Sequence, residues 1–338
     1  MAMNKIQFQA GLSMRDFQRQ YGTDEQCEAA VFASRWPQGW SCPRCAGARY
    51  ASTHNGRKLW ECLGCGYQCS SIVGTVFEHT KLPLSIWFLA IYLLTQSKNA
   101  VSALELKRQL GVSYKTAWLI KHKLLQTMLL REEPRRLDER VEIDDAYLGG
   151  EKAGKRGRGS DNKTAFVAAV QTGADGKPRF MRLTPVAGFT HEALTQWAAN
   201  SLASTAHVVS DGLWCFAAVT HTAATHERHV VGGGRQAVQR PEFRWVNTIL
   251  GNLKTALSGT YHAIDHAKYA HRYLAEFAYR FNRRFDLAAM VPRLLRAAVT
   301  TKPIPLSVLE PVQDLSGGRI AALKSNSKYS HTPCMHRF

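Results

Sequence analysis

The pattern of apolar and polar positions predicts helices in the first half of the chain. From residue 83 to residue 128, apolar residues recur at intervals of three and four, the spacing of an amphipathic helix. Segments 101–110 and 114–128 carry this pattern on either side of Gly111. One face of the first helix is formed by Leu84, Trp87, Phe88, Ile91 and Leu94. The sequence therefore predicts a helical domain over 80–130.

A helix, a glycine-containing turn and a second amphipathic helix resemble a helix-turn-helix. The second helix of this unit carries a row of cations, and we predict DNA contacts for Lys115, Lys121 and Lys123. Helical hairpins with solvated lysines also occur in proteins that never touch DNA, so a plain solvated face stays open as the alternative.

The pattern changes to short apolar or alternating runs after residue 140, as is typical of strands. These runs are 141–148, 164–171, 180–186 and 206–210, and helical patterns cover 190–202, 243–257, 267–283 and 287–299. Three strands, a helix, a fourth strand and further helices predict a mixed α/β sheet.

Composition adds a polyanionic partner to this picture. The chain has 338 residues, 45% of them hydrophobic, with a formal net charge of +18. Such a charge favours nucleic acid, although a basic protein without such a partner remains the alternative. Residues 1–20 do not resemble a signal peptide, and the apolar run 82–95 is too short to span a bilayer. We therefore predict a soluble, cytoplasmic protein.

Four cysteines form two closely spaced pairs near the N-terminus. They are Cys42, Cys45, Cys62 and Cys65. Paired cysteines at this spacing predict one tetrahedral zinc ion, with unrelated cysteine use as the alternative. The residues between the pairs, 49–61, alternate around Asn55 and Gly56 and predict a β-hairpin. The whole predicts a zinc ribbon, with Cys69 as a buried thiol outside the ligand set.

Two aspartates follow or interrupt predicted strands. Asp144 lies within the strand 141–148, and Asp211 directly follows the strand 206–210. Carboxylates on neighbouring strands can together bind hard divalent cations such as Mg²⁺ or Mn²⁺. For either aspartate alone, an ordinary turn or helix cap is the simpler explanation.

Several sequence blocks favour the metal-binding interpretation, because they resemble the signature segments of ISXO-type bacterial insertion-sequence transposases. The chain is similar to this family in its N-terminal zinc ribbon and in the order of these blocks. The resemblance covers most of the chain, from about residue 42 to residue 284. The blocks are VEIDDAYLGG (141–150), SDG (210–212), VNT (246–248) with LK (253–254), GTYH (259–262) and YRFNRR (279–284).

The resemblance implies an RNase H-like catalytic domain whose acidic triad binds two magnesium ions and drives strand cleavage and transfer. Asp144 matches the first acid and Asp211 the second. At the third position, where many relatives have Glu, this chain has Asn247, as does a subgroup of the family. An amide offers a carbonyl oxygen but no charge, so the second metal should be held more weakly. Lys254 lies seven residues later on the same helical face and would bind a phosphate.

The sequence leaves other roles open for several of these residues. Asn247 could instead cap its helix, and Glu242 could supply the missing carboxylate. His226 and His229 could orient water or phosphate, or simply be hydrogen-bonded histidines. Further DNA contacts are predicted for a basic segment that contains several glycines, for which an ordinary solvated loop is the alternative. They are also predicted for arginines at the rim of a helix. These residues are Lys155, Arg156 and Arg158 of the segment and Arg283 and Arg284 of the rim.

The combined prediction is a transposase that binds the terminal inverted repeats of an insertion sequence, cleaves DNA and transfers it to target DNA, as a homo-oligomer associated with the nucleoid. Its rivals are an inactive transposase-derived DNA-binding protein and a nuclease without strand transfer. The predicted division is a helical lead (1–35), a zinc ribbon (36–75), the helical domain (80–130), a charged linker (131–140), the catalytic domain (141–300) and a partly disordered tail (301–338).

Overall fold

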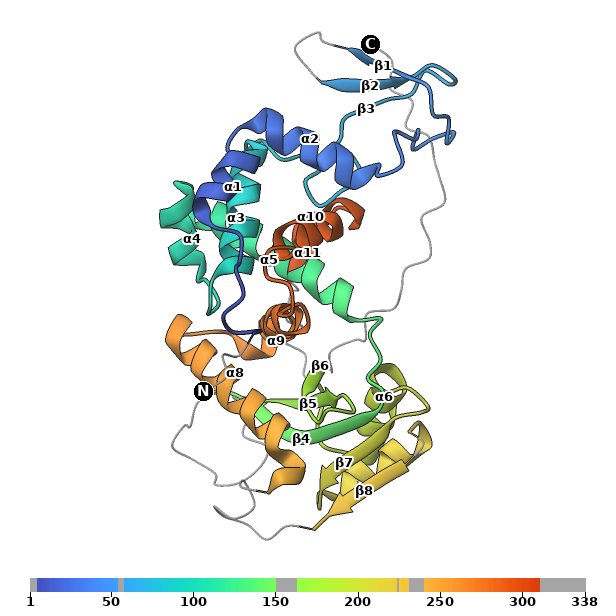
Figure 1. Ribbon diagram of the computed structural model, residues 1–338, viewed down its shortest axis with the longest axis vertical. Coiled ribbons are helices and arrows are strands. Elements are labelled where there is room, and N and C mark those ends of the chain that lie inside the picture. Colours follow the sequence, from blue (N-terminus) through green and yellow to red (C-terminus); the bar gives the residue numbers. More distant parts are fainter. Residues whose placement is uncertain (1–4, 54–57, 150–162, 224, 231–239, 311–338) are drawn as a thin grey trace.

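A computed structural model describes residues 5–53, 58–149, 163–223, 225–230 and 240–310 of the chain. Figure 1 shows three layers along the long axis: a small three-stranded sheet, a body of helices, and a larger five-stranded sheet with its own helices. Among the described residues, no helix is both long and apolar enough to cross a membrane.

The small sheet is built from three short antiparallel strands. They are β1 (Tyr50–Thr53), β2 (Leu59–Cys62) and β3 (Gln68–Cys69), and Tyr50 pairs with Cys62. The two strands of the predicted hairpin are thus confirmed, whereas its turn at Asn55 and Gly56 lies outside the described residues. Trp36, Trp40 and Trp60 pack beside the cysteines in a separate small core.

The helical body contains the three helices that periodicity predicts. They are α3 (Leu84–Gln96), α4 (Ala103–Leu110) and α5 (Tyr114–Glu132). Ser102 and Ser113 cap α4 and α5 through their side chains, and Gly111 ends α4 with a φ of 66°. Glycine adopts that left-handed conformation without steric cost, so this position sets the turn between the two helices.

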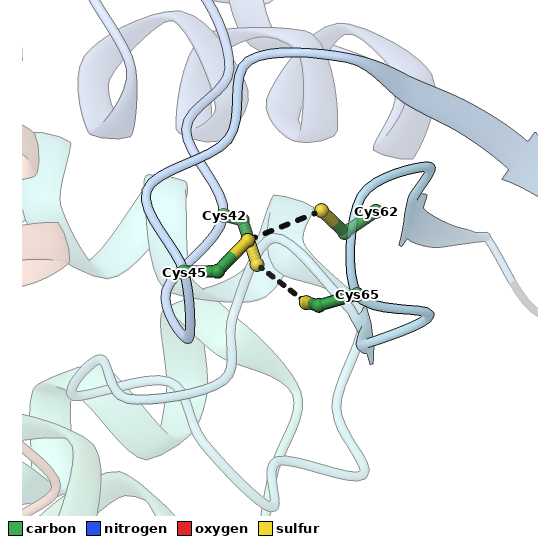
Figure 2. Close-up of side chains that lie close together, drawn as sticks. All are labelled: Cys42, Cys45, Cys62 and Cys65. Carbon is green, nitrogen blue, oxygen red and sulfur yellow. Dashed lines mark hydrogen bonds between the residues drawn. The ribbon is translucent and has the colours of Figure 1, made fainter.

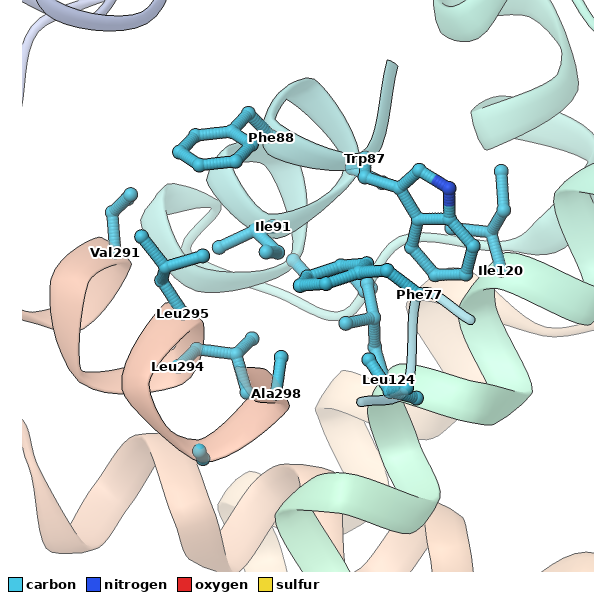
Figure 3. Close-up of a cluster of buried hydrophobic side chains, with 14 of the residues drawn as sticks. Phe77, Trp87, Phe88, Ile91, Ile120, Leu124, Val291, Leu294, Leu295 and Ala298 are labelled. Atoms are coloured by element: carbon cyan, nitrogen blue, oxygen red, sulfur yellow. The ribbon is translucent and has the colours of Figure 1, made fainter. Parts of the chain in front are cut away.

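Helices from both ends of the chain complete this body. They are α1 (Met14–Tyr21), α2 (Asp24–Arg35), α10 (Met290–Thr300) and the short α11 (Leu306–Leu309). Figure 3 shows Val291, Leu294 and Leu295 of α10 packed against Phe88 and Ile91 of α3. α10 therefore packs in the core of the helical body, whereas the predicted division assigns residues 287–299 to the catalytic domain. The polar tail beyond residue 310 lies outside the described residues.

The large sheet has five strands in the order β6-β5-β4-β7-β8. The strands are β4 (Arg140–Leu148), β5 (Thr164–Thr172), β6 (Pro178–Pro185), β7 (His207–Asp211) and β8 (Thr225–His229). β4, β5 and β6 are antiparallel neighbours, whereas β7 and β8 run parallel to β4. This is the mixed, helix-flanked sheet expected of an RNase H-like domain.

Each face of this sheet has its own apolar core. One face carries α6 (His191–Ser201) and the 3-10 helix η1 (Trp214–His221), which pack on Val141, Ile143 and Val208. The other face carries α8 (Arg244–Thr260), preceded by the 3-10 turn η2 (Pro241–Phe243), and α9 (His266–Asn282). Because side chains alternate along a strand, Glu142 and Asp144 point to the α8 face.

Candidate functional site

The four paired cysteines converge at one point in the zinc ribbon. Their sulfur atoms all lie within 4.8 Å of one another, with Cys42 Sγ 3.7 Å from Cys65 Sγ and Cys45 Sγ 3.5 Å from Cys62 Sγ (Figure 2). Thiolates bound to one tetrahedral zinc at about 2.3 Å would stand roughly 3.8 Å apart. The residues present therefore fit a structural zinc ion, and Cys69 is outside this cluster.

The two cysteine pairs have the same local geometry. In each, the second residue after the first cysteine donates its backbone N–H to that sulfur at 3.4 Å, from Arg44 to Cys42 and from Gly64 to Cys62. The residue after each second cysteine, Ala46 or Gly66, has a positive φ and donates to the carbonyl of the first at 2.9 Å. Two matched turns that each direct N–H groups at sulfur are suited to thiolate ligands.

A second cluster joins three carboxylates at the end of the large sheet. Oxygens of Asp144, Asp145 and Asp211 lie within 4.8 Å of one another, and all three side chains are partly exposed. Asp211 ends β7, which pairs with β4, so the strand pairing brings the two predicted acids together. Asp145 was missed at the sequence level, because alternation assigns it to the opposite face of β4. Oxygens this close suit a hard divalent cation.

Glu142 is a second residue that sequence reasoning missed. Its buried carboxylate accepts hydrogen bonds from the backbone N–H groups of Trp245 at 2.8 Å and Val246 at 3.0 Å. Arg140 donates to its other oxygen at 2.8 Å. Burial raises the pKa of Glu142, and these hydrogen bonds oppose that rise. Glu142 thus anchors the first turn of α8 to β4, two residues before Asp144.

This anchor holds the first turn of α8, which contains the predicted third position, to β4. Asn247 directly follows Val246 in the first turn of α8 and is half-buried. Phe243, whose side chain makes no capping hydrogen bond, stands at the N-cap position of α8, so Asn247 does not cap that helix. Lys254 is exposed two turns further along α8. Glu242 lies in η2, before α8, and is half-buried.

The two histidines between the second and third positions lie on the edge strand β8 and face opposite ways. His226 Nε2 is 2.8 Å from the hydroxyl of Ser210, and burial lowers the pKa of His226. His229 pairs in register with Asp211 and lies against the ring of Phe243, with Nε2 2.7 Å from a carboxylate oxygen of Glu227. His229 is therefore the histidine on the carboxylate face, and His226 is bound within the other layer.

Of the three predicted lysines on α5, the structure leaves one fully available. Lys115 is exposed beside Tyr114 at the start of the helix. Lys123 is half-buried over the ring of Trp87 and donates to the carbonyl of Val76. Lys121 is wholly buried, where it donates to the Tyr261 hydroxyl at 2.5 Å and lies 3.7 Å from Glu276. The predicted DNA contact of Lys121 is therefore wrong.

The arginines at the end of α9 are also structural. Arg283 donates to Glu132 of α5 and stacks on Tyr279, with only 11% of its side chain exposed. Arg284 donates to the backbone carbonyls of Pro178 and Arg179, the first two residues of β6. The predicted DNA contact of Arg283 is therefore wrong, because this arginine holds α9 to the end of α5, whereas Arg284 is half-buried and its DNA contact stays a prediction. Lys155, Arg156 and Arg158 lie outside the described residues.

Comparison with known families matches both parts of this architecture. Residues 22–68 match the transposase zinc-ribbon domain, and residues 136–282 match the ISXO2-like transposase domain. Both matched domains are transposase domains. The zinc-ribbon match contains all four cysteines, and the second match contains Asp144, Asp211 and Asn247.

A curated relative also comes from a mobile element. It is described as an uncharacterized protein in transposable element ISH50 of Halobacterium salinarum, and it is 35% identical over 131 residues. The matched region is 38% of this chain and 42% of that relative. Crystal structures of the Mos1 mariner paired end complex with Mn and of a pre-cleavage Mos1 transpososome overlap 66% of this chain. Both have TM-scores of 0.24, with identities of 12% and 10%, and the overlap covers 80% of each of those chains.

The family block at 279–284 has a structural role. Asn282 is buried, accepts from the backbone N–H of Met181 at 2.8 Å, and donates to Met181 O at 3.0 Å and to Glu132 at 2.6 Å. One side chain thereby joins α9, the edge strand β6 and the end of α5. The adjacent Arg280 donates to the carbonyl of Ser97, after α3. These contacts fix the sheet against the helices.

Proposed function

We propose that this protein is a transposase that cleaves DNA at the ends of an insertion sequence and joins the freed ends to target DNA. The observation that carries the proposal is the convergence of the Asp144 and Asp211 carboxylates at the end of the sheet, beside the helix with Asn247. The match to a transposase domain gives this cluster its assigned chemistry.

In this proposal Asp144 and Asp211 bind magnesium or manganese, and Asn247 contributes a neutral amide oxygen. When bound, such ions activate a water or a 3′ hydroxyl and stabilise the leaving oxygen of a phosphodiester. Asp145 adds a third carboxylate to the same cluster. Glu142 holds α8 so that Asn247 stays on the carboxylate face. Lys254, exposed further along α8, binds a phosphate of the strand.

Binding of the terminal inverted repeats is assigned to the zinc ribbon and to the start of α5. In a helix-turn-helix, the first residues of the second helix contact base edges. Tyr114 and Lys115 are exposed at that position. Lys123 is half-buried, so it would contact only a phosphate that lies at the edge of α5. The segment with Lys155, Arg156 and Arg158 would add phosphate contacts, and two copies of the chain would pair the two ends.

The test is a cleavage and joining assay on DNA with the element's own ends, with and without magnesium. We expect Asp144→Asn and Asp211→Asn to lose both products at least 100-fold. Asp175→Asn, which changes an exposed acid in the β5–β6 turn, should act like the wild type. A wild type that makes nicks but no joined product would indicate a nuclease without strand transfer.

Asn247 is tested by its dependence on metal concentration. An amide ligand without charge should hold metal weakly. We expect Asn247→Glu to lower the magnesium concentration needed for half-maximal cleavage, and Asn247→Ala to abolish cleavage. The control is Asn252→Ala, an exposed asparagine of the same helix. Wild-type protein that binds the ends but cuts at no magnesium concentration would make this an inactive DNA-binding descendant of a transposase.

A further inference from the structure

An exposed tryptophan follows the second aspartate of the carboxylate cluster by three residues. Trp214 is 60% exposed, whereas the other seven of the eight tryptophans are buried or half-buried. Its indole makes no hydrogen bond or ring contact with any residue that the structure describes. Tryptophan has a large apolar surface and is usually placed where at least part of that surface is covered. An indole left open here therefore needs a reason.

The helix that carries Trp214 does not require it. η1 is a 3-10 helix, so residues three apart share a face. Cys215, Phe216, Ala218 and Val219 are buried in the core under the sheet, and the remaining face is Trp214, Ala217 and Thr220. The two other positions of this solvent-facing row hold small residues. The packing of η1 would be the same with a small residue in place of Trp214.

The backbone before Trp214 is firmly held at the site. Asp211 accepts a hydrogen bond from the backbone N–H of Leu213 at 3.0 Å, and Arg228 donates to the carbonyl of Gly212 at 2.5 Å. A Cβ on Gly212 would lie 3.3 Å from Cα of Val230, so β8 packs closely on this turn. The same turn thus fixes the Asp211 carboxylate and the start of η1. The backbone that leads into Trp214 is therefore held to the Asp211 carboxylate.

We propose that Trp214 stacks on an unpaired base of the DNA strand beside the scissile phosphate. The proposal rests on the proposed function, because it takes the phosphate to lie at the carboxylates. In this proposal, the base next to that phosphate leaves its partner and turns toward the segment after Asp211. Unpairing has an energetic cost, and an aromatic face offsets it for any base. Val230, 75% exposed and packed on Gly212, gives further apolar surface at the same turn.

The experiment combines cleavage with fluorescence of 2-aminopurine placed at single positions beside the cleavage site. We compare Trp214→Ala and Trp214→Phe with the wild type, and use Phe285→Ala as the control, an exposed aromatic on the loop after α9. Stacking on one base corresponds to a loss of about 5- to 150-fold on truncation to alanine. Trp214→Ala should lose cleavage by that factor, and Trp214→Phe should retain most of it. Binding of the wild type should change the 2-aminopurine fluorescence, whereas binding of Trp214→Ala should leave it unchanged.

The outcomes separate this proposal from the proposed function. If wild type never cuts but alters the 2-aminopurine signal through Trp214, the proposed function fails and the stacking stands. If wild type cuts and Trp214→Ala cuts equally fast with the same fluorescence change, the stacking proposal is overturned alone. It is also overturned if Trp214→Ala changes the oligomeric state of the DNA-free protein, because the indole then covers a second copy of the chain. Failure to bind the ends at all overturns both.

Discussion

Replacing Asn282 with alanine tests whether the end of α9 is a structural junction. The Asn282 side chain is 5% exposed and makes three hydrogen bonds. Two of them satisfy both backbone groups of Met181 on β6, and the third reaches Glu132 on α5. Alanine cannot replace any of them, and the site is too enclosed for the freed groups to reach bulk water.

The expected loss of stability follows from the groups left without partners. A buried polar group without a hydrogen bond costs about 1–3 kcal/mol. Asn282→Ala leaves two such groups on Met181, whereas Glu132 keeps Arg283 and Arg135 as partners. The free energy of unfolding should therefore fall by about 2–6 kcal/mol.

Urea unfolding followed by circular dichroism measures this loss. Asn252→Ala, which removes an exposed asparagine from α8, should change stability by less than about 0.5 kcal/mol. Asn282→Asp keeps an acceptor for the Met181 N–H but cannot donate to Glu132, so we expect it to be at least as unstable as Asn282→Ala. A loss below about 1 kcal/mol with Asn282→Ala, together with weaker DNA binding, would refute the junction and restore a DNA-facing role.

Three further perturbations follow from the structure. Lys115→Ala should weaken DNA binding and reduce the salt dependence of the binding constant by about one unit, with the stability of the protein unchanged. Lys121→Ala should instead lower the free energy of unfolding by about 3–5 kcal/mol, because it leaves the buried Glu276 without its cation. Equal stability of the two variants would contradict this expectation. Removal of zinc by a chelator, or Cys62→Ser, should raise amide exchange in the ribbon and leave the large sheet protected. Burial and the nearby Arg272 lower the pKa of His122 to about 3, below its ordinary 6.5. The neutral imidazole therefore contributes its full stabilisation above pH 6.5. The free energy of unfolding falls as the pH drops toward 3, by up to about 1.4 kcal/mol per pH unit. In a His122→Asn variant, the urea midpoint should decrease less between pH 7 and pH 5 than in the wild type.

The helices and buried strands could be predicted because their signal is local. α4 and α5 begin at serine caps and are separated by a glycine, and the apolar spacing runs through both. The strand β8 was missed for the opposite reason. Its sequence, Thr225–His229, contains no apolar residue. An edge strand packed on one neighbour tolerates such residues, so only the pairing of His229 with Asp211 reveals it.

The candidate site was predictable where family motifs mark it, and less so where it depends on neighbours. Asp144 and Asp211 stand in matched blocks, but no sequence pattern shows that Asp145 joins them. Alternation assigns Asp145 to the other face of β4, yet its carboxylate oxygen lies within 4.8 Å of those of Asp144 and Asp211. Glu142 was missed because its partners are backbone N–H groups about 100 residues further along the chain.

The exposure of the basic residues was the least predictable feature. It determines how much of the formal charge of +18 can contribute to DNA binding. Helical periodicity cannot distinguish a lysine that faces solvent from one that faces another helix. Lys121, Arg272 and Arg280 are held inside the protein by carbonyl, hydroxyl or carboxylate partners. Their charges are fixed on buried partners and are not available to release counterions from DNA. The salt dependence of binding should therefore count the exposed cations, such as Lys115 and Lys254, and fall well short of the formal charge.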